Sequence, residues 1–329
     1  MSAVKIDIKI IDPCKKSQHK QNNGSFAILV VLDCKRGKMN PFKLLIIFLL
    51  ISTALTAEQK VVLISGASKG IGLATAKEFH AKGWKVWAGY RTSVPHELSA
   101  LKDMRFCRLD VTDEKLVHSV VEEILANEGR IDALINNAGY GLIGVEESVT
   151  IEEAKQVFDV NYFGALRLTQ AVLPTMRKQK SGSIVNISSG VGVHALPGFG
   201  LYSASKFALE AMTESLAATV AHWNIKVSVV EPGFVHNDWG AHSVMGSRDI
   251  NEDFYAKLNR GVYELIAVPH GQPCEEVAKL LYQIVELPKP NVRYQTTKEM
   301  TEWVSEKFVD PTGMTTHEEN LEYIQRYLD

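Results

Sequence analysis

The stretch VVLISGASKGIG, residues 61–72, joins a short apolar run to a loop with three glycines, and a helix-like segment follows at residues 71–82. Glycines let such a loop turn tightly, and the unpaired N–H groups at the start of the following helix stabilise a pyrophosphate. The stretch therefore predicts a strand, loop and helix that bind a dinucleotide. The loop residues expected at the cofactor are Ser65, Gly66, Ser68, Lys69, Gly70, Ile71 and Gly72.

Apolar runs and helix-like segments keep alternating along the rest of the chain. We expect strands at residues 61–65, 85–90, 105–110, 132–137, 183–188, 226–231 and 292–296. Further helices are expected at residues 113–128, at 151–179 in two pieces, and at 201–223. Strands that alternate with helices are typical of βαβ units. The sequence thus predicts the α/β class, with a single doubly wound Rossmann-type domain over residues 58–329 and a mostly parallel seven-stranded sheet.

Composition limits the possible function classes. The 329 residues are 46% hydrophobic and 22% charged, with a net charge of -2, which is typical of a folded globular protein. Since no basic stripe interrupts this balance, we expect no nucleic-acid partner. Cys14, Cys34, Cys107 and Cys274 form no CxxC pair and no Cys/His cluster with ligand spacing, so we expect reduced thiols and no metal site.

A leader of 57 residues precedes the domain, with a signal-peptide-like or anchor segment at about residues 42–57. Lys43 is followed by an unbroken apolar run at residues 44–55 and then by small residues up to Ala57. This order is typical of a signal peptide that starts at Met39. A membrane anchor is the second interpretation, although the run is shorter than the ~20 residues that span a bilayer, and a buried helix is the third.

The end of the second strand bears on cofactor choice. An acid there would bind the ribose hydroxyl of NAD, but this strand ends in Gly89-Tyr90-Arg91. The guanidinium group of Arg91 suits a phosphate, and Lys69 adds a second positive charge, so we expect a preference for NADP(H), with NAD(H) still possible. The alternative is that both are ordinary surface residues. Asp110, which closes the third strand, is expected either to accept from the adenine amino group or to help cap a helix.

A literal Gly-x-Gly-x-x-Gly also occurs, at Gly139, Gly141 and Gly144. The mechanism of that fingerprint needs a glycine turn that opens a helix. Several residues separate these glycines from the next expected helix, so we interpret this second match as a coincidence.

The pattern Tyr202-Ser203-Ala204-Ser205-Lys206 lies where a helix is expected to begin. Residues four apart share a helix face, so Lys206 can place its ammonium group near the Tyr202 phenol. A fixed cation lowers the pKa of a phenol from its ordinary value of about 10, which yields a proton donor and acceptor suited to an alcohol/ketone couple.

Other polar residues follow the strands at the edge that lines the ligand crevice of an open parallel sheet. They are Ser189, Asn136-Asn137-Ala138-Gly139 and Pro232-Gly233, with Asn161 within an expected helix. In this order the chain resembles the short-chain dehydrogenase/reductase family over about residues 60–235. The longer stretch 199–210, Arg293-Tyr294-Gln295-Thr296 and Asp310-Pro311-Thr312-Gly313 look like the branch of estradiol 17β-dehydrogenase and retinol dehydrogenases, which act on lipophilic alcohols and ketones.

The resemblance implies roles for these residues. Tyr202 would exchange the proton, Ser189 would orient the carbonyl oxygen and Lys206 would lower the tyrosine pKa while binding the ribose. Asn161 would hold a water in the proton relay. Hydride would pass directly between nicotinamide and the carbonyl carbon, without a metal. The remaining cofactor-binding residues would be Asp110, Val111, Asn137, Ala138, Gly139, Pro232, Gly233 and Val235, and the family implies a homo-oligomer.

Two positions depart from the family pattern, which usually has Thr at both. Ser65 keeps the hydroxyl group at the start of the glycine loop. Asn237, a few residues after Pro232-Gly233, keeps hydrogen-bonding capacity but changes its shape, which puts the contact with the nicotinamide side of the cofactor in doubt.

Residues 234–265 carry several aromatic side chains, among them Trp239, Phe254 and Tyr255. We expect a mobile lid over an apolar pocket. The alternative is that these aromatics pack on the helix at residues 274–286. His236 and His242 lack a third ligand and are expected to be polar lining or surface residues.

The leading hypothesis is an NADP(H)-dependent oxidoreductase that interconverts a lipophilic secondary alcohol and ketone, or an alcohol and aldehyde. The alternative enzyme is an NAD-dependent dehydrogenase that works in the oxidative direction. The alternative from a non-catalytic class is a protein that senses dinucleotides without turnover. Because NADP(H) is intracellular, we expect a cytoplasmic or membrane-associated enzyme that faces a cofactor-containing compartment, whereas cleavage within residues 39–57 would export it.

Overall fold

The computed structural model divides the chain into two compact units, Met1–Glu58 and Gln59–Asp329. The described residues are 7–10, 28–31, 59–94, 101, 104–267 and 271–327. In the first unit β1 (Asp7–Ile10) pairs antiparallel with β2 (Ile28–Val31). The predicted apolar segment at residues 42–57 lies outside the described residues. Among the helices that are described, none has both the length and the apolar content to cross a membrane.

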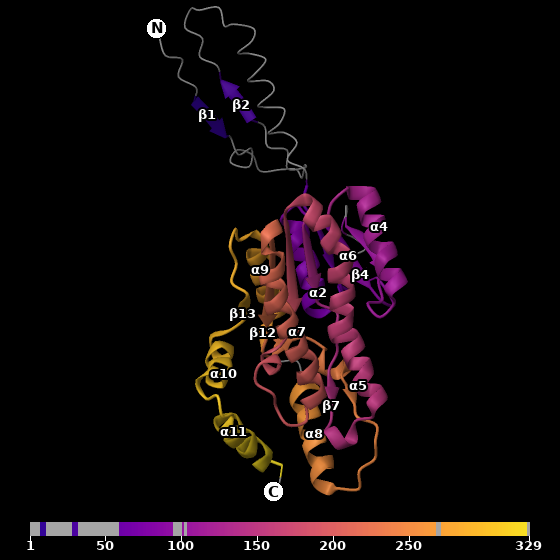
Figure 1. Ribbon diagram of the computed structural model, residues 1–329, viewed down its shortest axis with the longest axis vertical. Helices are drawn as coiled ribbons and strands as arrows, with labels where there is room; N and C mark the ends of the chain where they lie inside the picture. The colour runs from indigo at the N-terminus through magenta and orange to yellow at the C-terminus, as the bar shows by residue number, and fades with distance from the viewer. Residues whose placement is uncertain are drawn as a thin grey trace, which may run out of the picture. The chain divides into compact units, whose positions relative to one another are not determined.

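A seven-stranded, fully parallel sheet forms the centre of the second unit, which confirms the predicted fold class (Figure 1). Its order is β13-β9-β8-β6-β3-β4-β5. The strands are β3 (Val61–Ile64), β4 (Lys85–Tyr90), β5 (Arg105–Arg108), β6 (Ala133–Asn136), β8 (Gly182–Ile187), β9 (Ile225–Glu231) and β13 (Arg293–Gln295). The order reverses between β3 and β6, and ligands bind such sheets in the crevice at this switch point.

Helices cover both faces of the sheet, because alternate residues of each strand point to opposite sides. Val61 and Leu63 of β3 pack with α4 (Glu114–Glu128) and α6 (Gly164–Gln179). Val62 and Ile64 pack with α2 (Gly70–Ala81) and α9 (Cys274–Glu286). Burial on both faces explains why these strands appear in the sequence as continuous apolar runs.

The long helical stretch expected at residues 151–179 consists of two α-helices. Between α5 (Ile151–Phe158) and α6 lies a π-helical segment, Asp159–Phe163. Single-turn π-helices occur often at functional sites. The next helix, α7 (Gly200–Val220), begins near the carboxyl end of β8 and carries the Tyr202 and Lys206 pattern.

Among the described residues of the second unit, there are also two short ladders and three further α-helices. β10 (Val235–His236) pairs with β12 (Gln272–Pro273), and β11 (Val244–Met245) pairs with β7 (Leu142–Ile143). The helices are α8 (Asp253–Ala267), α10 (Lys298–Val309) and α11 (Met314–Gln325). The last two follow one another at the C-terminal end of the chain, in yellow in Figure 1.

Candidate active site

Ser65 ties the glycine loop to the turn after β6. Its hydroxyl oxygen accepts hydrogen bonds from the backbone N–H groups of Asn137 and Ala138, both at 3.0 Å. The Asn137 side-chain amide donates back to the carbonyl oxygens of Ser65 and Gly66, at 3.0 and 2.9 Å. Serine therefore supplies the hydroxyl contact at this position, and two predicted cofactor segments are held side by side across the switch point.

Glycine is required in this loop for reasons that the structure makes specific. Gly66 has φ +64°, a backbone conformation that other residues rarely adopt. A side-chain carbon at Gly72 would overlap the carbonyl oxygen of Gly66. The α2 helix that follows has no side-chain cap and no acidic residue in its first turn. The first N–H groups of any helix lack intrahelical partners, and those of α2 have no side-chain cap. This arrangement fits the pyrophosphate of a dinucleotide.

The predicted phosphate-binding cations lie at the surface. Arg91 is exposed just after β4, and the Lys69 ammonium group lies 3.6 Å from the Asp238 carboxylate. Both partners of this pair are about half exposed, at 47% and 50%, so solvent weakens their attraction. Lys69 thus remains able to exchange Asp238 for a ligand phosphate.

Asp110 lies in a turn that its own side chain stabilises. The carboxylate accepts hydrogen bonds from the backbone and the hydroxyl of Thr112, at 3.0 and 2.7 Å. Burial acts to raise its pKa, but these hydrogen bonds and the charges of Arg91 and Arg108 outweigh it, so the pKa lies below its usual range. The side-chain cap of α4 is Asp113 and not Asp110. The Asp110 carboxylate is therefore an ionised hydrogen-bond acceptor outside that cap. The carbonyl of neighbouring Val111 accepts from Arg167 at 3.2 Å.

The second glycine pattern does not open a helix, which agrees with its interpretation as a coincidence. Gly141 and Gly144 flank β7, and side chains at these positions would collide with Trp239 and Ser148. Gly139 still belongs to the site, because a Cβ there would lie 3.1 Å from the Asn161 side-chain oxygen and 3.5 Å from the Lys206 ammonium group.

Tyr202 and Lys206 are both buried on α7, with 6% and 5% exposure. The Lys206 ammonium group lies 5.8 Å from the Tyr202 ring centroid and donates to the Ile187 carbonyl oxygen at 2.8 Å. Ile187 ends β8, two residues before Ser189. The backbone N–H of Gly190 donates to the Pro232 carbonyl oxygen at 3.0 Å, so the turn after β8 and the Pro232-Gly233 turn after β9 lie together.

The electrostatics of the Tyr202 phenol differ from the sequence-based expectation. Burial raises the pKa of Tyr202, and the Ser189 hydroxyl acts in the opposite direction. Burial also lowers the pKa of Lys206 to about 8, although the charge of Glu210 acts to raise it. Lys206 donates to a backbone carbonyl, and the Ser189 hydroxyl is the neighbour that acts to lower the pKa of the phenol. The expected proton exchange by Tyr202 stays a prediction.

Asn161 lies in the π-helical segment and is 1% exposed. Its side chain accepts from the Tyr140 backbone N–H at 3.0 Å and donates to the Tyr140 carbonyl at 3.0 Å and the Ser205 hydroxyl at 3.1 Å. Ser205 in turn donates to the Tyr202 carbonyl at 2.7 Å. Asn161 thus connects the loop after β6 to the first turn of α7, in addition to any contact with water.

The structure brings the four predicted catalytic residues to one edge of the sheet, next to the glycine loop. Comparison with known proteins agrees: residues 60–244 match the family model for short chain dehydrogenase. The chain belongs to the short-chain dehydrogenase family.

Relatives of this short-chain dehydrogenase include retinol dehydrogenase 8 of Homo sapiens, with 32% identity over 290 residues, 80% of this chain and 91% of that protein. The 17-beta-hydroxysteroid dehydrogenase type 1 of Homo sapiens is 33% identical over 282 residues, 77% and 82% of the two chains. The 3-ketodihydrosphingosine reductase of Bacteroides thetaiotaomicron is 43% identical, but over 176 residues that make up 54% of this chain and 64% of that protein.

Solved structures give the same assignment. A short-chain dehydrogenase from Streptomyces avermitilis has a TM-score of 0.68 and 32% identity, covering 82% of this chain and all of the other. ElxO, solved with NADP bound, has a TM-score of 0.62 and 27% identity over 74% of this chain and 99% of that one. The dehydrogenase described here is therefore an oxidoreductase with an NAD(P)-binding Rossmann fold.

Aromatic side chains of the predicted lid region lie beside Tyr202. The ring centroids of Trp239 and Tyr202 lie 5.3 Å apart, and the ring of Phe199, just before α7, lies 6.3 Å from that of Tyr202. Phe254 and Tyr255 pack into the same apolar cluster. The alternative that these aromatics pack on α9 is wrong, because they pack with Tyr202 and α8 in a cluster that contains no residue of Cys274–Glu286. His236 and His242 are exposed, as expected.

Asn237 and Val235 support the glycine loop from the lid side. The Asn237 side chain accepts from the Trp239 backbone N–H at 2.8 Å and lies next to Gly70, where a Cβ would be 3.7 Å from it. Val235 packs on α2 and α9. Asn237 therefore orients Trp239. The family pattern, which usually has Thr at this position, does not indicate this role.

A buried carboxyl network behind Lys206 was not predicted. Glu210 and Glu231 are 5% and 0% exposed, and Arg293 lies 3.2 Å from one and 2.9 Å from the other. Burial, together with the charge of Glu231, raises the pKa of Glu210. The sequence singles out Arg293 as part of a late motif, but only the fold shows that β13 places it beside β9 and α7.

Proposed function

We propose that this short-chain dehydrogenase uses NADP(H) to interconvert a lipophilic secondary alcohol and its ketone, or an alcohol and its aldehyde. The observation that carries this proposal is the position of the Tyr202 phenol. It lies buried between Ser189 and an apolar cluster that includes Trp239, Phe199 and Val262. A proton donor with one polar neighbour and aromatic walls suits a carbonyl group on an apolar skeleton.

Each polar residue then has a defined task. Tyr202 donates its proton to the substrate oxygen in reduction and takes it back in oxidation. The Ser189 hydroxyl holds that oxygen in place and favours the ionised phenol between turnovers. Lys206 supplies positive charge beside the phenol, and Asn161 fixes the first turn of α7. A bound nicotinamide supplies or accepts the hydride.

Arg91 and Lys69 support the preference for NADP(H), since both are accessible cations beside the glycine loop and no acid ends β4. ElxO, a structural neighbour, binds NADP. Fluorescence titration of the full chain with NADPH and NADH tests this preference. We expect tighter binding of NADPH, and Arg91→Asp should reverse the order. If NADPH and NADH bind with equal affinity to the wild type and also to Arg91→Asp, the NAD-dependent alternative gains support.

The names of three relatives support a lipophilic substrate: one is a retinol dehydrogenase, one a 17-beta-hydroxysteroid dehydrogenase and one a 3-ketodihydrosphingosine reductase. A panel of retinoid, steroid, long-chain keto and small aromatic carbonyls tests this class. We expect turnover to rise with the apolar size of the substrate. Tight NADPH binding without turnover of any compound would favour the dinucleotide-sensing alternative.

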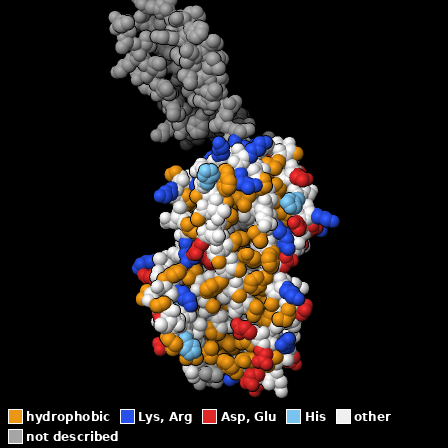
Figure 2. All heavy atoms as spheres, in the orientation of Figure 1, with side chains coloured by type: hydrophobic (Ala, Val, Ile, Leu, Met, Phe, Trp, Pro, Cys, Tyr) orange, Lys and Arg blue, Asp and Glu red, His pale blue; other side chains and the backbone are white. Residues whose placement is uncertain are grey.

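An apolar face on α5, α6 and α7 supports a homo-oligomer. Ile151 of α5, Phe163 of the π-helical segment and Phe207 of α7 are exposed at 61%, 44% and 38%, and the first two line a groove of about 640 Å³. Figure 2 shows hydrophobic side chains gathered over much of the face in view. Light scattering should give a dimer or larger for the wild type and a smaller species for Phe163→Glu with Phe207→Glu. Val309→Glu, at another exposed apolar position, is the control.

The predicted segment at residues 42–57 supports attachment of the enzyme to a membrane that faces a cofactor-containing compartment. Fractionation of the full chain and of a chain that starts at Met39 tests this placement. We expect both in the membrane fraction. A mature N-terminus near Glu58 outside the cytosol would overturn it.

A further inference from the structure

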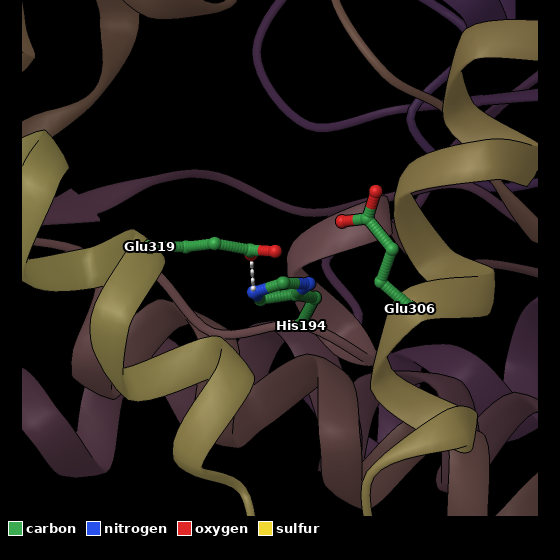
Figure 3. A group of neighbouring side chains, drawn as sticks. All are labelled: His194, Glu306 and Glu319. Carbon is green, nitrogen blue, oxygen red and sulfur yellow. Dashed lines mark ion pairs between the residues drawn. The ribbon is translucent and has the colours of Figure 1, made fainter.

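A histidine and two glutamates converge beside the turn after Ser189, here called the active-site turn, on the side that faces the C-terminal helices (Figure 3). One ligand atom from each of His194, Glu306 and Glu319 lies within 4.8 Å of the other two. His194 follows the turn after Ser189, whereas Glu306 belongs to α10 and Glu319 to α11. Three segments far apart in the sequence thus meet at one point.

His194 is 1% exposed, and its ring is held in a fixed orientation. It stacks on the Trp303 ring with centroids 4.5 Å apart and planes 10° from parallel. Its Nε2 forms an ion pair with a carboxylate oxygen of Glu319 at 3.2 Å, drawn as a dashed line in Figure 3, but neither ring nitrogen has a well-aligned hydrogen bond. A buried imidazole that relies on a misaligned contact is costly, and its Nε2 points toward Glu319.

The two carboxylates repel each other unless a cation or proton lies between them. An imidazole nitrogen beside two carboxylates is the donor set that divalent transition metals bind.

The surrounding packing fixes these elements on the active-site turn. A side-chain carbon at Gly190 would overlap the Met300 sulfur, so α10 lies directly on the turn. The Asn320 side chain of α11 donates to the Ala195 carbonyl oxygen at 3.2 Å. Tyr323, also on α11, packs into the apolar cluster around Tyr202. Anything that joins α10 and α11 to His194 therefore also fixes one wall of the proposed substrate pocket.

We propose that His194, Glu306 and Glu319 bind a Zn²⁺ ion that fastens the two C-terminal helices to the turn after Ser189. Ligand atoms of a tetrahedral zinc site with bonds of about 2 Å lie about 3.3 Å apart, close to the observed separation of 3.2 Å between His194 and Glu319. The ligand atom of exposed Glu306 lies within 4.8 Å of the other two, so its side chain would have to move closer to bind the ion. Three protein ligands leave a position for water. Imidazole with carboxylate favours Zn²⁺ over Mg²⁺, which prefers oxygen ligands alone.

Calorimetric titration of the chelator-treated full chain with ZnCl₂ and with MgCl₂ tests this site. Because Glu306 and Glu319 lie on helix surfaces, Glu306→Gln and Glu319→Gln should fold, which circular dichroism checks. Glu318→Gln, at the exposed neighbour of Glu319, is the matched control. The absorption spectrum of the Co²⁺-loaded protein gives a second measure of the ligand set.

We expect one Zn²⁺ per chain, a higher melting temperature with Zn²⁺ and no comparable effect of Mg²⁺. Glu306→Gln and Glu319→Gln should each weaken Zn²⁺ binding by at least about tenfold, and Glu318→Gln should not. Two results would overturn the proposal: no saturable Zn²⁺ binding, or equal affinity in all four proteins, which would place the ion elsewhere, for example on cysteines.

Discussion

The carboxyl group of Glu210 lies one turn of α7 beyond Lys206, and its charge raises the pKa of that buried ammonium group against the effect of burial. The pair lies behind the catalytic face, where Glu210 also meets Glu231 and Arg293. We therefore predict that Glu210 acts as a positioning residue, whose effect reaches the substrate through Lys206.

Glu210→Gln should move the alkaline limb of the pH–rate profile. If charged Lys206 is needed, kcat/KM falls as the pH rises through its pKa of about 8. Without the Glu210 charge this pKa is lower, so the fall should begin about 0.5–1 pH unit earlier. Glu214→Gln, which removes another partner of Arg293, should leave the limb in place. An unchanged limb in Glu210→Gln would separate Glu210 from the function of Lys206.

The stability of the fold should also depend on Glu210. A carboxyl group whose pKa is raised by folding contributes stability that is complete below its unfolded pKa and is lost as the pH rises through the folded value. The melting temperature of the wild type should therefore fall relative to that of Glu210→Gln between about pH 4.5 and 8. If the melting temperatures of the two proteins change in parallel with pH over this range, the raised pKa of Glu210 is contradicted.

Ser65→Ala should loosen the contact between the glycine loop and the turn after β6. The backbone N–H groups of Asn137 and Ala138 would lose their acceptor, at a cost of about 1–3 kcal/mol in the free energy of unfolding. Urea denaturation and NADPH titration measure the two effects, and NADPH affinity should fall as well. Ser65→Thr keeps the hydroxyl group and should behave as the wild type. A loss of stability with unchanged NADPH affinity would show that the contact does not shape the cofactor site.

Trp239→Ala should impair substrate binding more than cofactor binding. Removing an indole that lies 5.3 Å from the Tyr202 ring opens the apolar wall of the proposed pocket. We expect KM for the preferred lipophilic substrate to rise about tenfold, from lost apolar contact area, while the NADPH Kd stays the same. His242→Ala, on an exposed part of the same segment, is the control. A rise in the NADPH Kd alone would place Trp239 on the cofactor side.

The sheet could be predicted because its strands are buried on both faces, so that Val61–Ile64 and the other strands appear as apolar runs between helices. The positions of the candidate catalytic residues could be predicted because Tyr202 and Lys206 share a helix face and Ser189 follows a strand, whereas their roles stay predictions. Contacts between distant segments could not be predicted. Glu210 with Arg293, and His194 with Glu306 and Glu319, have no local spacing to reveal them. In the folded chain β13 lies beside β9 and α7, and α10 and α11 reach the turn after Ser189.

The central claim is that Tyr202 transfers the proton, and comparison of wild type with Tyr202→Phe tests it most directly. NADPH binding and turnover of the best carbonyl substrate are measured on both full chains. We predict an NADPH Kd within about twofold of the wild type and a kcat lower by about 10²–10⁴-fold. Turnover by Tyr202→Phe at the wild-type rate would contradict the assignment of Tyr202 as the acid and base of this dehydrogenase.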